Sequence, residues 1–258
     1  MRIIAGPCQH QSFEHSMMIA GHCKRIAEEN GFEYIFKASF DKANRSSNGT
    51  QRGQGLSETM MDFERMKDKI DGLKILTDVH SESNIYDIIT HYNDAVDVLQ
   101  IPAFLCRQTD LVKLACDTDK IINIKKGQFL APWDMEGIMT KTSAAKEVWV
   151  TERGTSFGYN NLVVDFTGVR QLVDTFGNRN VVMDATHSVQ KPGAGNGVSG
   201  GNRYYAPHIA YAAAAVGVTN FFLEVHEDPD NAPSDGPNMI KIEDFEEVIT
   251  KLKKLTEI

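Results

Sequence analysis

The sequence predicts a single (β/α)8 barrel, a TIM barrel, over residues 1–258. Eight short apolar or β-branched runs alternate with amphipathic stretches, which predicts right-handed β-α-β units and a parallel sheet. Eight units in a chain of 258 residues fit a closed barrel better than an open doubly wound sheet. The open dinucleotide-binding sheet is further disfavoured because no Gly-x-Gly-x-x-Gly motif opens the first helix.

The eight apolar runs are short and rich in Val, Ile, Leu and Phe, which is typical of parallel strands buried on both faces. In chain order, the predicted strands are residues 2–5, 34–38, 73–78, 97–101, 121–125, 148–152, 181–185 and 221–225. After each run, apolar residues spaced three and four apart predict a helix. The predicted helices are residues 13–30, 56–70, 82–93, 108–116, 135–146, 164–176, 203–217 and 242–255. No linker, low-complexity tract or charge block interrupts this alternation, so we expect one domain.

The composition excludes several classes of function. A balance of 27 Lys and Arg against 35 Asp and Glu gives a formal net charge of −8, which argues against general affinity for nucleic acid or acidic membranes. The longest run of low polarity, residues 210–218, is far shorter than the roughly 20 residues that span a bilayer. Met1 leads directly into RIIAGP without a secretory pattern, so we expect a cytoplasmic protein. The four cysteines lack C-x-x-C spacing, which argues against a disulfide framework.

Polar and reactive residues follow every predicted strand, and the loops at this end of a (β/α)8 barrel carry the active site. In chain order these residues are Cys8, the segment 37–47, Asp78 with His80, Gln100, Lys125 with Lys126, Glu152 with Arg153, His187, and Glu224 with His226. Because the carboxyl ends of all the strands meet at one rim, we expect these residues to share one site.

Five cations are predicted to point toward this rim, namely Lys37, Lys42, Arg45, Lys125 and Arg153. Cations that converge on one cavity repel each other unless a multiply charged phosphate or carboxylate lies between them. Single residues of this kind are also common as solvated surface charges.

The segment KANRSS, residues 42–47, adds hydrogen-bonding groups to this set. Arg45, Ser46 and Ser47 offer a guanidinium fork and two hydroxyls, which suit a phosphate monoester, and Asn44 can contact sugar hydroxyls. The same residues favour a capped turn, so both interpretations remain open.

Cys8, His187, Glu224 and Asp235 combine a thiol, an imidazole and two carboxylates. Such a donor set suits a borderline divalent cation such as Zn²⁺, Fe²⁺, Mn²⁺ or Co²⁺. The four residues lie far apart in the chain, so spacing does not decide between this site and separate structural roles. The glycine-rich segment 188–203 lacks the Gly-Lys-Ser/Thr ending of a phosphate-binding loop, and we interpret it as a mobile lid, with simple disorder as the alternative.

Seven motifs taken in order carry a resemblance that spans nearly the whole chain. They are KASFDKANRSS, TDVH, QIPAFLCRQTDL, IKKGQFLAPWDM, TERGTSFGYNNLVVDF, DATHSVQ and SDGP. In this order they closely resemble the 3-deoxy-D-manno-octulosonate-8-phosphate synthases. That resemblance implies the condensation of phosphoenolpyruvate with arabinose 5-phosphate, which releases inorganic phosphate and forms the eight-carbon sugar acid of lipopolysaccharide.

The resemblance also implies roles for individual residues. Lys42, Lys125 and Arg153 would bind the phosphate and carboxylate of phosphoenolpyruvate, with Lys37 nearby, and Asp78 and Gln100 would complete the pocket. Asn44, Arg45 and Ser46 would bind the pentose phosphate, helped by Arg107 from a neighbouring subunit of a homotetramer. The cysteine of AGPC stands where the metal-free branch of the family has asparagine, so a divalent metal held by Cys8, His187, Glu224 and Asp235 is implied. Lys42, Cys8, His187 and Asp235 are the implied catalytic residues.

Two departures and two alternatives accompany this interpretation. GTQRGQG, residues 49–55, replaces a Ser-Tyr-Arg-Gly-Pro-Gly turn, which leaves the role of Arg52 open, and the lid sequence KPGAGNGVSGG differs from its relatives. The sister 3-deoxy-arabino-heptulosonate-7-phosphate synthases use erythrose 4-phosphate, but their second loop reads Lys-Pro-Arg-Thr rather than Lys-Ala-Asn-Arg-Ser. The other alternative is a non-catalytic sensor of sugar phosphates that retains the barrel.

Overall fold

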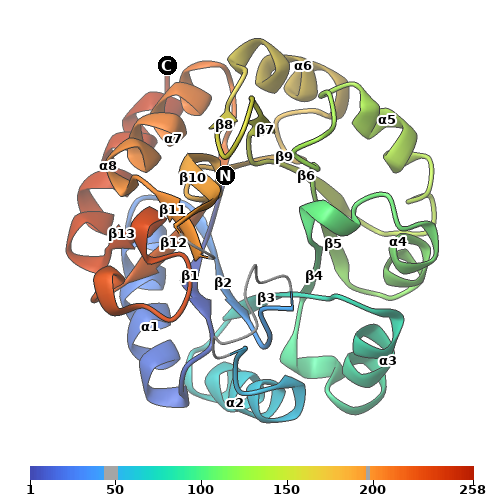
Figure 1. Ribbon diagram of the computed structural model, residues 1–258. Coiled ribbons are helices and arrows are strands. Elements are labelled where there is room, and N and C mark those ends of the chain that lie inside the picture. The colour runs from blue at the N-terminus through green and yellow to red at the C-terminus, as the bar shows by residue number, and fades with distance from the viewer. Residues whose placement is uncertain (44–51, 196–197) are drawn as a thin grey trace.

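The computed structural model describes residues 1–43, 52–195 and 198–258. Within these ranges, parallel strands pair in the order β1-β2-β3-β4-β5-β6-β9-β12, and β12 pairs with β1 to close the barrel. Figure 1 looks along the barrel and shows the helices arranged around the ring of strands. The predicted (β/α)8 fold is therefore confirmed.

The barrel strands are β1 (Arg2–Gln9), β2 (Glu33–Ser39), β3 (Lys74–Asp78), β4 (Val98–Ile101), β5 (Ile121–Lys125), β6 (Val148–Glu152), β9 (Val181–Asp184) and β12 (Asn220–His226). The helices outside them are α1 (Phe13–Glu29), α2 (Leu56–Lys69), α3 (Glu82–His91), α4 (Thr109–Cys116), α5 (Asp134–Met139), α6 (Phe166–Phe176), α7 (Ala206–Ala215) and α8 (Phe245–Thr256). Short 3-10 helices lie at Asn93–Ala95, Ala103–Leu105, His187–Val189, Arg203–Tyr205, Pro229–Asn231, Gly236–Asn238 and Ile242–Asp244. In the described part of the chain, no helix is both long and apolar enough to cross a membrane.

Most elements lie within three residues of the predicted bounds at each end, and two differ by more. The helix predicted over 135–146 ends at Met139, where the Thr140 hydroxyl donates to the carbonyl of Gly137 at 2.7 Å. Threonine hydroxyls that bond to nearby carbonyls compete with the regular helix, which favours a turn here. The first strand continues to Gln9 instead of ending at Ala5, and its pairing with β2 shifts register between Ala5 and Cys8. Cys8 therefore lies on a strand.

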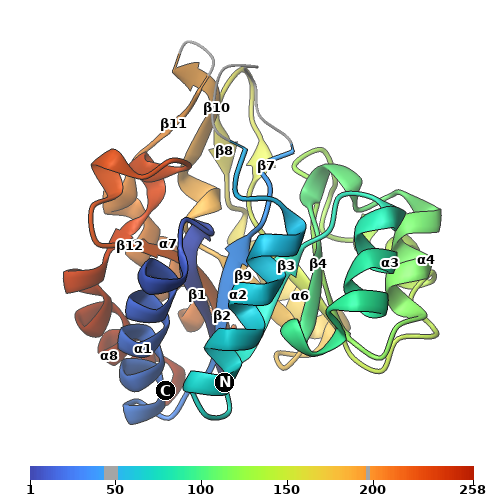
Figure 2. The ribbon, with the colours of Figure 1, turned by 90° about the horizontal axis from the view of Figure 1, so that it is seen from below.

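Three short pairings beyond the barrel strands were not predicted. β7 (Thr155–Ser156) pairs with β8 (Leu162–Val163), β10 (Gln190–Gly195) pairs with β11 (Val198–Gly201), and β13 (Ile240–Lys241) lies beside β12. The first two pairs are antiparallel hairpins at one end of the barrel, and both chain termini lie at the other end (Figure 2). The segment 188–203, predicted as a lid, therefore contains a hairpin.

The interior of the barrel is apolar in its lower layer and polar toward the carboxyl ends of its strands. Its apolar layer consists of Ile4, Ile35, Leu76, Val98, Trp149, Val182 and Phe222. A larger apolar core fills the space between the strands and the helices. On the carboxyl side of Phe222 the interior carries charged groups, because the ammonium of Lys125 lies 3.7 Å from the centre of that ring. This change places the polar site at the carboxyl end of the barrel.

Candidate active site

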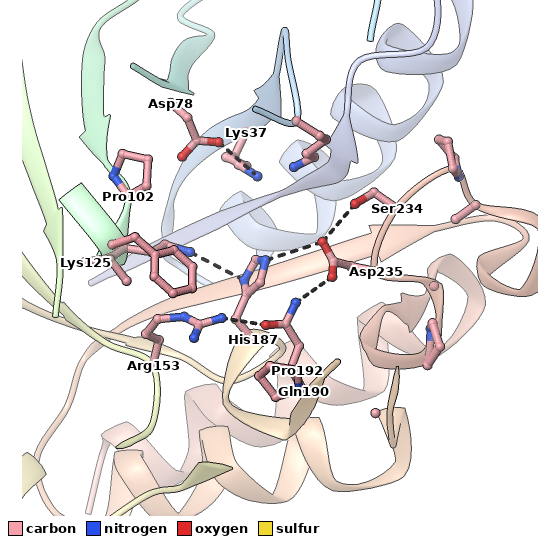
Figure 3. A pocket seen from close by; sticks show the side chains of 18 of the residues that line it. Lys37, Asp78, Pro102, Lys125, Arg153, His187, Gln190, Pro192, Ser234 and Asp235 are labelled. Carbon is pink, nitrogen blue, oxygen red and sulfur yellow. Dashed lines mark hydrogen bonds and ion pairs between the residues drawn. The ribbon is translucent and has the colours of Figure 1, made fainter. Parts of the chain in front are cut away.

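A cavity of about 800 Å³ opens at the carboxyl ends of the barrel strands. The predicted site residues that line it are Lys37, Lys42, Asp78, Gln100, Lys125, Arg153, His187 and Asp235. Figure 3 shows side chains from well-separated strands turned toward one another across this cavity. Cys8 and Glu224 are fully buried and contact the lining lysines, as described below. The structure thus brings residues from both ends of the chain together.

Two buried cations, Lys125 and Arg153, face the cavity (Figure 3). Lys125 forms an ion pair with Asp184, and Nη2 of Arg153 donates to Oε1 of Gln190 at 2.6 Å. Burial lowers the pKa of Lys125 and of Arg153, and the Asp184 carboxylate opposes this change only in part. Nη1 of Arg153 is also buried, and it has no hydrogen-bond partner among the described residues. Because a buried donor without a partner costs free energy, Arg153 is suited to receive a phosphate or carboxylate oxygen.

Lys37 and Lys42 surround Cys8 on β1. Nζ of Lys37 donates to Oε1 of Glu224 at 2.8 Å and to the Cys8 carbonyl at 3.1 Å, and it lies 3.8 Å from a carboxylate oxygen of Asp78. Burial alone would lower the pKa of Lys37, but these anionic neighbours together raise it well above its ordinary value. Nζ of Lys42 lies 2.9 Å from both the carbonyl oxygen and Sγ of Cys8. The ammonium of Lys37 therefore remains charged beside the thiol.

A ladder of polar side chains inside the barrel fixes Asp78. Thr151 donates to Oδ1 of Asn123 at 2.6 Å, Asn123 donates to Oε1 of Gln100 at 2.8 Å, and Gln100 donates to Asp78. Ser39 donates to the other carboxylate oxygen of Asp78. Burial would raise the pKa of Asp78, but the ammonium groups nearby lower it well below its usual range. Asp78 is therefore ionised and held rigidly at the edge of the cavity.

The four predicted metal ligands meet on one side of the cavity. Cys8, His187 and Asp235 offer ligand atoms that lie within 4.8 Å of one another. Sγ of Cys8 lies 3.3 Å from Oδ2 of Asp235, and Nε2 of His187 lies 3.6 Å from Oε1 of Glu224. The other carboxylate oxygen of Glu224 is buried and, within the described ranges, has no hydrogen-bond partner. A buried carboxylate oxygen left unpaired beside a thiol and an imidazole fits a divalent cation.

Asp184 orients the imidazole of His187. Its carboxylate lies 2.7 Å from Nδ1 of the ring and also accepts the backbone N–H of His187 at 2.9 Å. With the ring proton on Nδ1, the lone pair of Nε2 faces Glu224 and Asp235. A carboxylate behind the ring is the usual arrangement of a metal-binding histidine. Burial would raise the pKa of Asp184, but His187 and Lys125 lower it well below its ordinary value, so it is ionised.

Two of these residues have an unusual backbone conformation. Cys8 has φ of 65° and Asp235 has φ of 56°, in the left-handed region that residues with a side chain rarely occupy. Such conformations cost of order 1–3 kcal/mol each and cluster at functional sites. At Cys8, the conformation coincides with the register shift of β1 and turns Sγ toward Lys42 and Asp235.

The thiol of Cys8 is held in its protonated form. Burial, and then the Glu224 carboxylate, raise its pKa to about 12, although Lys42 and Lys37 oppose this. The protonated thiol donates to Asp235. A divalent cation would displace this proton, as metal ions generally do at thiolate ligands. The chemistry and burial of the four side chains thus fit such an ion.

Four predicted substrate-binding residues are not among the described residues that line this cavity. Asn44, Arg45 and Ser46 lie outside the described residues, so their roles stay predictions. Arg107 is not among the described residues that line the cavity of its own chain. Its guanidinium lies 5.2 Å from the ring centre of Phe129, a half-exposed side chain.

Asp184 and Gln190 were not predicted as site residues. Asp184 pairs with Lys125 and His187, and Gln190 links Arg153 to Asp235, because its Nε2 donates to Oδ1 of Asp235 at 2.5 Å. Asp184 stands at the carboxyl end of a predicted strand, a position that could have marked it. Gln190 falls in the segment that was interpreted as a lid.

Comparisons with known proteins agree with this architecture. The model of the DAHP synthetase I family matches residues 1–258. The 2-dehydro-3-deoxyphosphooctonate aldolase of Rickettsia bellii (strain OSU 85-389) is 48% identical over 258 residues, which cover 99% of this chain and 92% of that protein. The protein of the same name from Bradyrhizobium diazoefficiens is 50% identical over 252 residues, 97% of this chain and 87% of the relative. The one from Bartonella quintana is 49% identical over 252 residues, 97% of this chain and 88% of the relative.

Proposed function

The chain belongs to the DAHP synthetase I family, and from this premise we propose that it condenses phosphoenolpyruvate with D-arabinose 5-phosphate and water. The products are 3-deoxy-D-manno-octulosonate 8-phosphate and inorganic phosphate. It is an enzyme of the same kind as its 2-dehydro-3-deoxyphosphooctonate aldolase relatives. The observation that supports this most directly is the buried, incompletely paired guanidinium of Arg153, which shares a cavity with Lys125 and with the cluster around Cys8.

Phosphoenolpyruvate carries a phosphate and a carboxylate, and the buried cations supply matching partners. We assign Arg153 and Lys125 to these groups, since burial destabilises both cations until an anion binds beside them. Gln190 holds the guanidinium of Arg153 in place, and Asp184 holds the ammonium of Lys125. Lys37 lies deeper, where it neutralises Glu224.

The sugar phosphate is assigned to the opposite side of the cavity. Asn44, Arg45 and Ser46 come two to four positions after Lys42 in the chain and would bind the pentose and its phosphate. Asp78 and Gln100 would fix the aldehyde end of the sugar through the polar ladder inside the barrel. These assignments rest on the resemblance of the KANRSS motif and on the position of Lys42.

In the proposed reaction, the methylene carbon of phosphoenolpyruvate forms a bond to the aldehyde carbon of arabinose 5-phosphate. The aldehyde oxygen becomes an alkoxide and takes a proton, for which Nζ of Lys42 is the donor we propose. Carbon 2 of phosphoenolpyruvate becomes electron-deficient and adds the hydroxyl of water, and the proton that the water loses replaces the one that Lys42 donated. The bond between carbon 2 and the phosphate oxygen then breaks and releases inorganic phosphate. Preorganised cations stabilise such charge where it develops, because they need no reorganisation at the moment of reaction.

We further propose that Cys8, His187, Glu224 and Asp235 hold a divalent metal ion, with Zn²⁺, Fe²⁺, Mn²⁺ and Co²⁺ as the candidates. When bound, such an ion supplies a Lewis acid for the aldehyde oxygen. The protein's own contribution is to orient the ligands: Asp184 fixes the ring of His187, and the left-handed backbone aims Cys8 and Asp235 at each other.

We also propose a homotetramer in the cytoplasm whose product enters lipopolysaccharide biosynthesis. Support for an assembly comes from Phe129 beside Arg107 and from Phe104 three positions earlier in the chain, which are 53% and 54% exposed. Apolar rings exposed beside a cation are typical of protein interfaces. In such an assembly, Arg107 would reach the sugar phosphate of a neighbouring subunit.

A phosphate-release assay tests the proposal. Chelator-stripped enzyme is supplied with phosphoenolpyruvate and either arabinose 5-phosphate or erythrose 4-phosphate, with and without each candidate metal. We expect release with the pentose that chelation abolishes and metal restores, and we expect Cys8→Ala to stay inactive while Cys116→Ala, a buried cysteine outside the site, behaves as wild type. Faster release with erythrose 4-phosphate would indicate the sister activity, and binding without release would indicate a sensor. Full activity after metal removal would exclude the metal.

A further inference from the structure

A second cluster of metal-ligating groups lies between the start of α1 and the end of β12. It consists of His15 in the first turn of α1, His226 at the end of β12, and Glu227 directly after it, and we call it the His15–His226–Glu227 cluster. Each residue offers a ligand atom within 4.8 Å of the others. All three are absent from the described residues that line the active-site cavity, so this cluster is separate from the site around Cys8.

The spacing of these atoms is close to that of ligands around a metal ion. Oε2 of Glu227 lies 2.8 Å from Nε2 of His15 and 3.3 Å from Nδ1 of His226. The two imidazole centroids are 4.9 Å apart, and the rings are tilted by 47°. Around tetrahedral Zn²⁺, with bonds of 2.0 to 2.2 Å, neighbouring ligand atoms are about 3.4 Å apart. Small side-chain rotations therefore suffice to enclose an ion.

Hydrogen bonds alone do not satisfy this cluster. The N–H of Asp228 donates to Nδ1 of His226 at 3.0 Å, so the proton of a neutral ring is on Nε2, and the Nδ1 lone pair faces Oε2 of Glu227. The side-chain amide nitrogen of Gln11 lies 2.7 Å from Nε2, and turning this amide by 180° places Oε1 there to accept the ring proton, as the partner behind a metal-binding ring does. Nε2 of His15 donates to Oε2 of Glu227 at 2.8 Å, whereas Nδ1 of the same ring is buried and lacks a hydrogen-bond partner in the described part of the chain.

A cation between the three atoms would replace the proton that His15 shares with Glu227, and it would also relieve the repulsion between the Nδ1 lone pair of His226 and Oε2 of Glu227. The proton of His15 then resides on Nδ1, which frees Nε2 for the ion. Asp228 lies in an exposed turn, so water can replace Nδ1 of His226 as the acceptor of its N–H. The side chain of Glu227 is 41% exposed, which gives the ion a path from solvent and leaves a coordination position for water.

We propose that the His15–His226–Glu227 cluster binds a second divalent ion, of the Zn²⁺, Ni²⁺ or Co²⁺ type that two imidazoles and a carboxylate favour. The ion links the first helix of the barrel to its last strand, next to the closing pair β1 and β12. Its position outside the cavity makes it a structural ion. Binding to the folded chain alone stabilises that chain by mass action.

Counting tightly bound Zn²⁺ tests this site. Chelator-stripped full-length protein is titrated with Zn²⁺ against a chromogenic chelator, and the wild type is compared with Glu227→Gln and His15→Ala. Both variants should bind one equivalent fewer than the wild type, or bind it at least 100-fold more weakly. His22→Ala, on the same helix but outside the cluster, should bind as many equivalents as the wild type. Equal stoichiometry and affinity in the wild type and Glu227→Gln would overturn the proposal.

The difference in bound Zn²⁺ between the wild type and these variants does not depend on the ion at Cys8, because that ion adds the same number of equivalents to each protein. With Co²⁺ in place of Zn²⁺, the thiolate of Cys8 produces a near-ultraviolet charge-transfer band that the His15–His226–Glu227 cluster cannot produce. Glu227→Gln should keep this band and lose one equivalent. If no protein shows this band but Glu227→Gln still binds one equivalent fewer than the wild type, the metal at Cys8 is refuted and the second site is supported. Glu227→Gln changes an exposed side chain, so it also tests the site if His15→Ala fails to fold.

Discussion

Replacing Arg153 with lysine should weaken the use of phosphoenolpyruvate while leaving the charge of the cavity unchanged. Arg153 uses two nitrogen donors: Nη2 donates to Oε1 of Gln190 at 2.6 Å, and the buried Nη1 is available to an anion. A lysine ammonium on a shorter, flexible chain can replace one of these contacts but does not reproduce the fork. Losing one charge-assisted hydrogen bond, about 1.5–3 kcal/mol, corresponds to about a 10- to 150-fold fall in kcat/KM.

Steady-state phosphate release at varied phosphoenolpyruvate measures this effect. A rise in KM with constant kcat would mean that the lost bond acts in binding, whereas an equal fall in kcat and kcat/KM would mean that it acts only in the transition state. Arg170→Lys on the exposed face of α6, where Arg170 pairs with Asp174, controls for the exchange itself. A change in kcat/KM of less than about 2-fold in Arg153→Lys would refute the assigned role.

Three further predictions concern stability. Gly6→Ala would place Cβ 1.9 Å from the carbonyl oxygen of Lys37, so we expect the free energy of unfolding in urea to fall by about 3 kcal/mol. Gly21→Ala, whose Cβ meets nothing within 4 Å, is the control. An unchanged urea midpoint in Gly6→Ala would contradict this close packing. Lys126→Met removes the ammonium that lies 3.4 Å from the buried carboxylate of Glu152, which keeps two backbone hydrogen bonds but loses its counter-ion. We expect a cost of about 3–5 kcal/mol in the same assay, and a smaller loss would contradict a charged pair at this position. Burial raises the pKa of Glu33, but hydrogen bonds from neighbouring cations outweigh this and lower it. Its stabilisation is therefore present above the unfolded pKa of about 4.3 and lost below it, so Glu33→Gln should flatten the acid side of the stability profile, and parallel profiles would contradict this.

The sequence predicted the barrel and the rim of its site because both follow from local pattern. Each strand is a continuous apolar run, and the residues at its end or just after it face the common rim. Asp78, Lys125 and Arg153 were predicted in this way, and all three line the cavity. Local pattern could not identify Gln190, because its role depends on two partners that are distant in the chain, the guanidinium of Arg153 and the carboxylate of Asp235. Residue order does not reveal which polar groups will be paired across a barrel.

The same limit applies to the backbone around the cysteine. Cys8 lies on a strand that was predicted to end at residue 5, and only the register shift against β2 and the left-handed φ bring its thiol to the carboxylate of Asp235. A side chain in that conformation opposes folding, and a serine or glycine would be equally compatible with the local pattern of β1.

The energetics of the cavity connect its stability to its function. Burial disfavours the charged forms of Lys125 and Arg153, and Asp184 and Gln190 compensate only in part. The unliganded protein therefore holds cations in an environment that becomes favourable when an anion arrives. An anion bound there gains contacts that need no rearrangement, so part of the free energy lost in building the site is recovered on binding. For this reason phosphoenolpyruvate alone should raise the unfolding temperature of the wild type, and this increase should be smaller in Arg153→Lys; equal increases would show that Arg153 does not contact the anion.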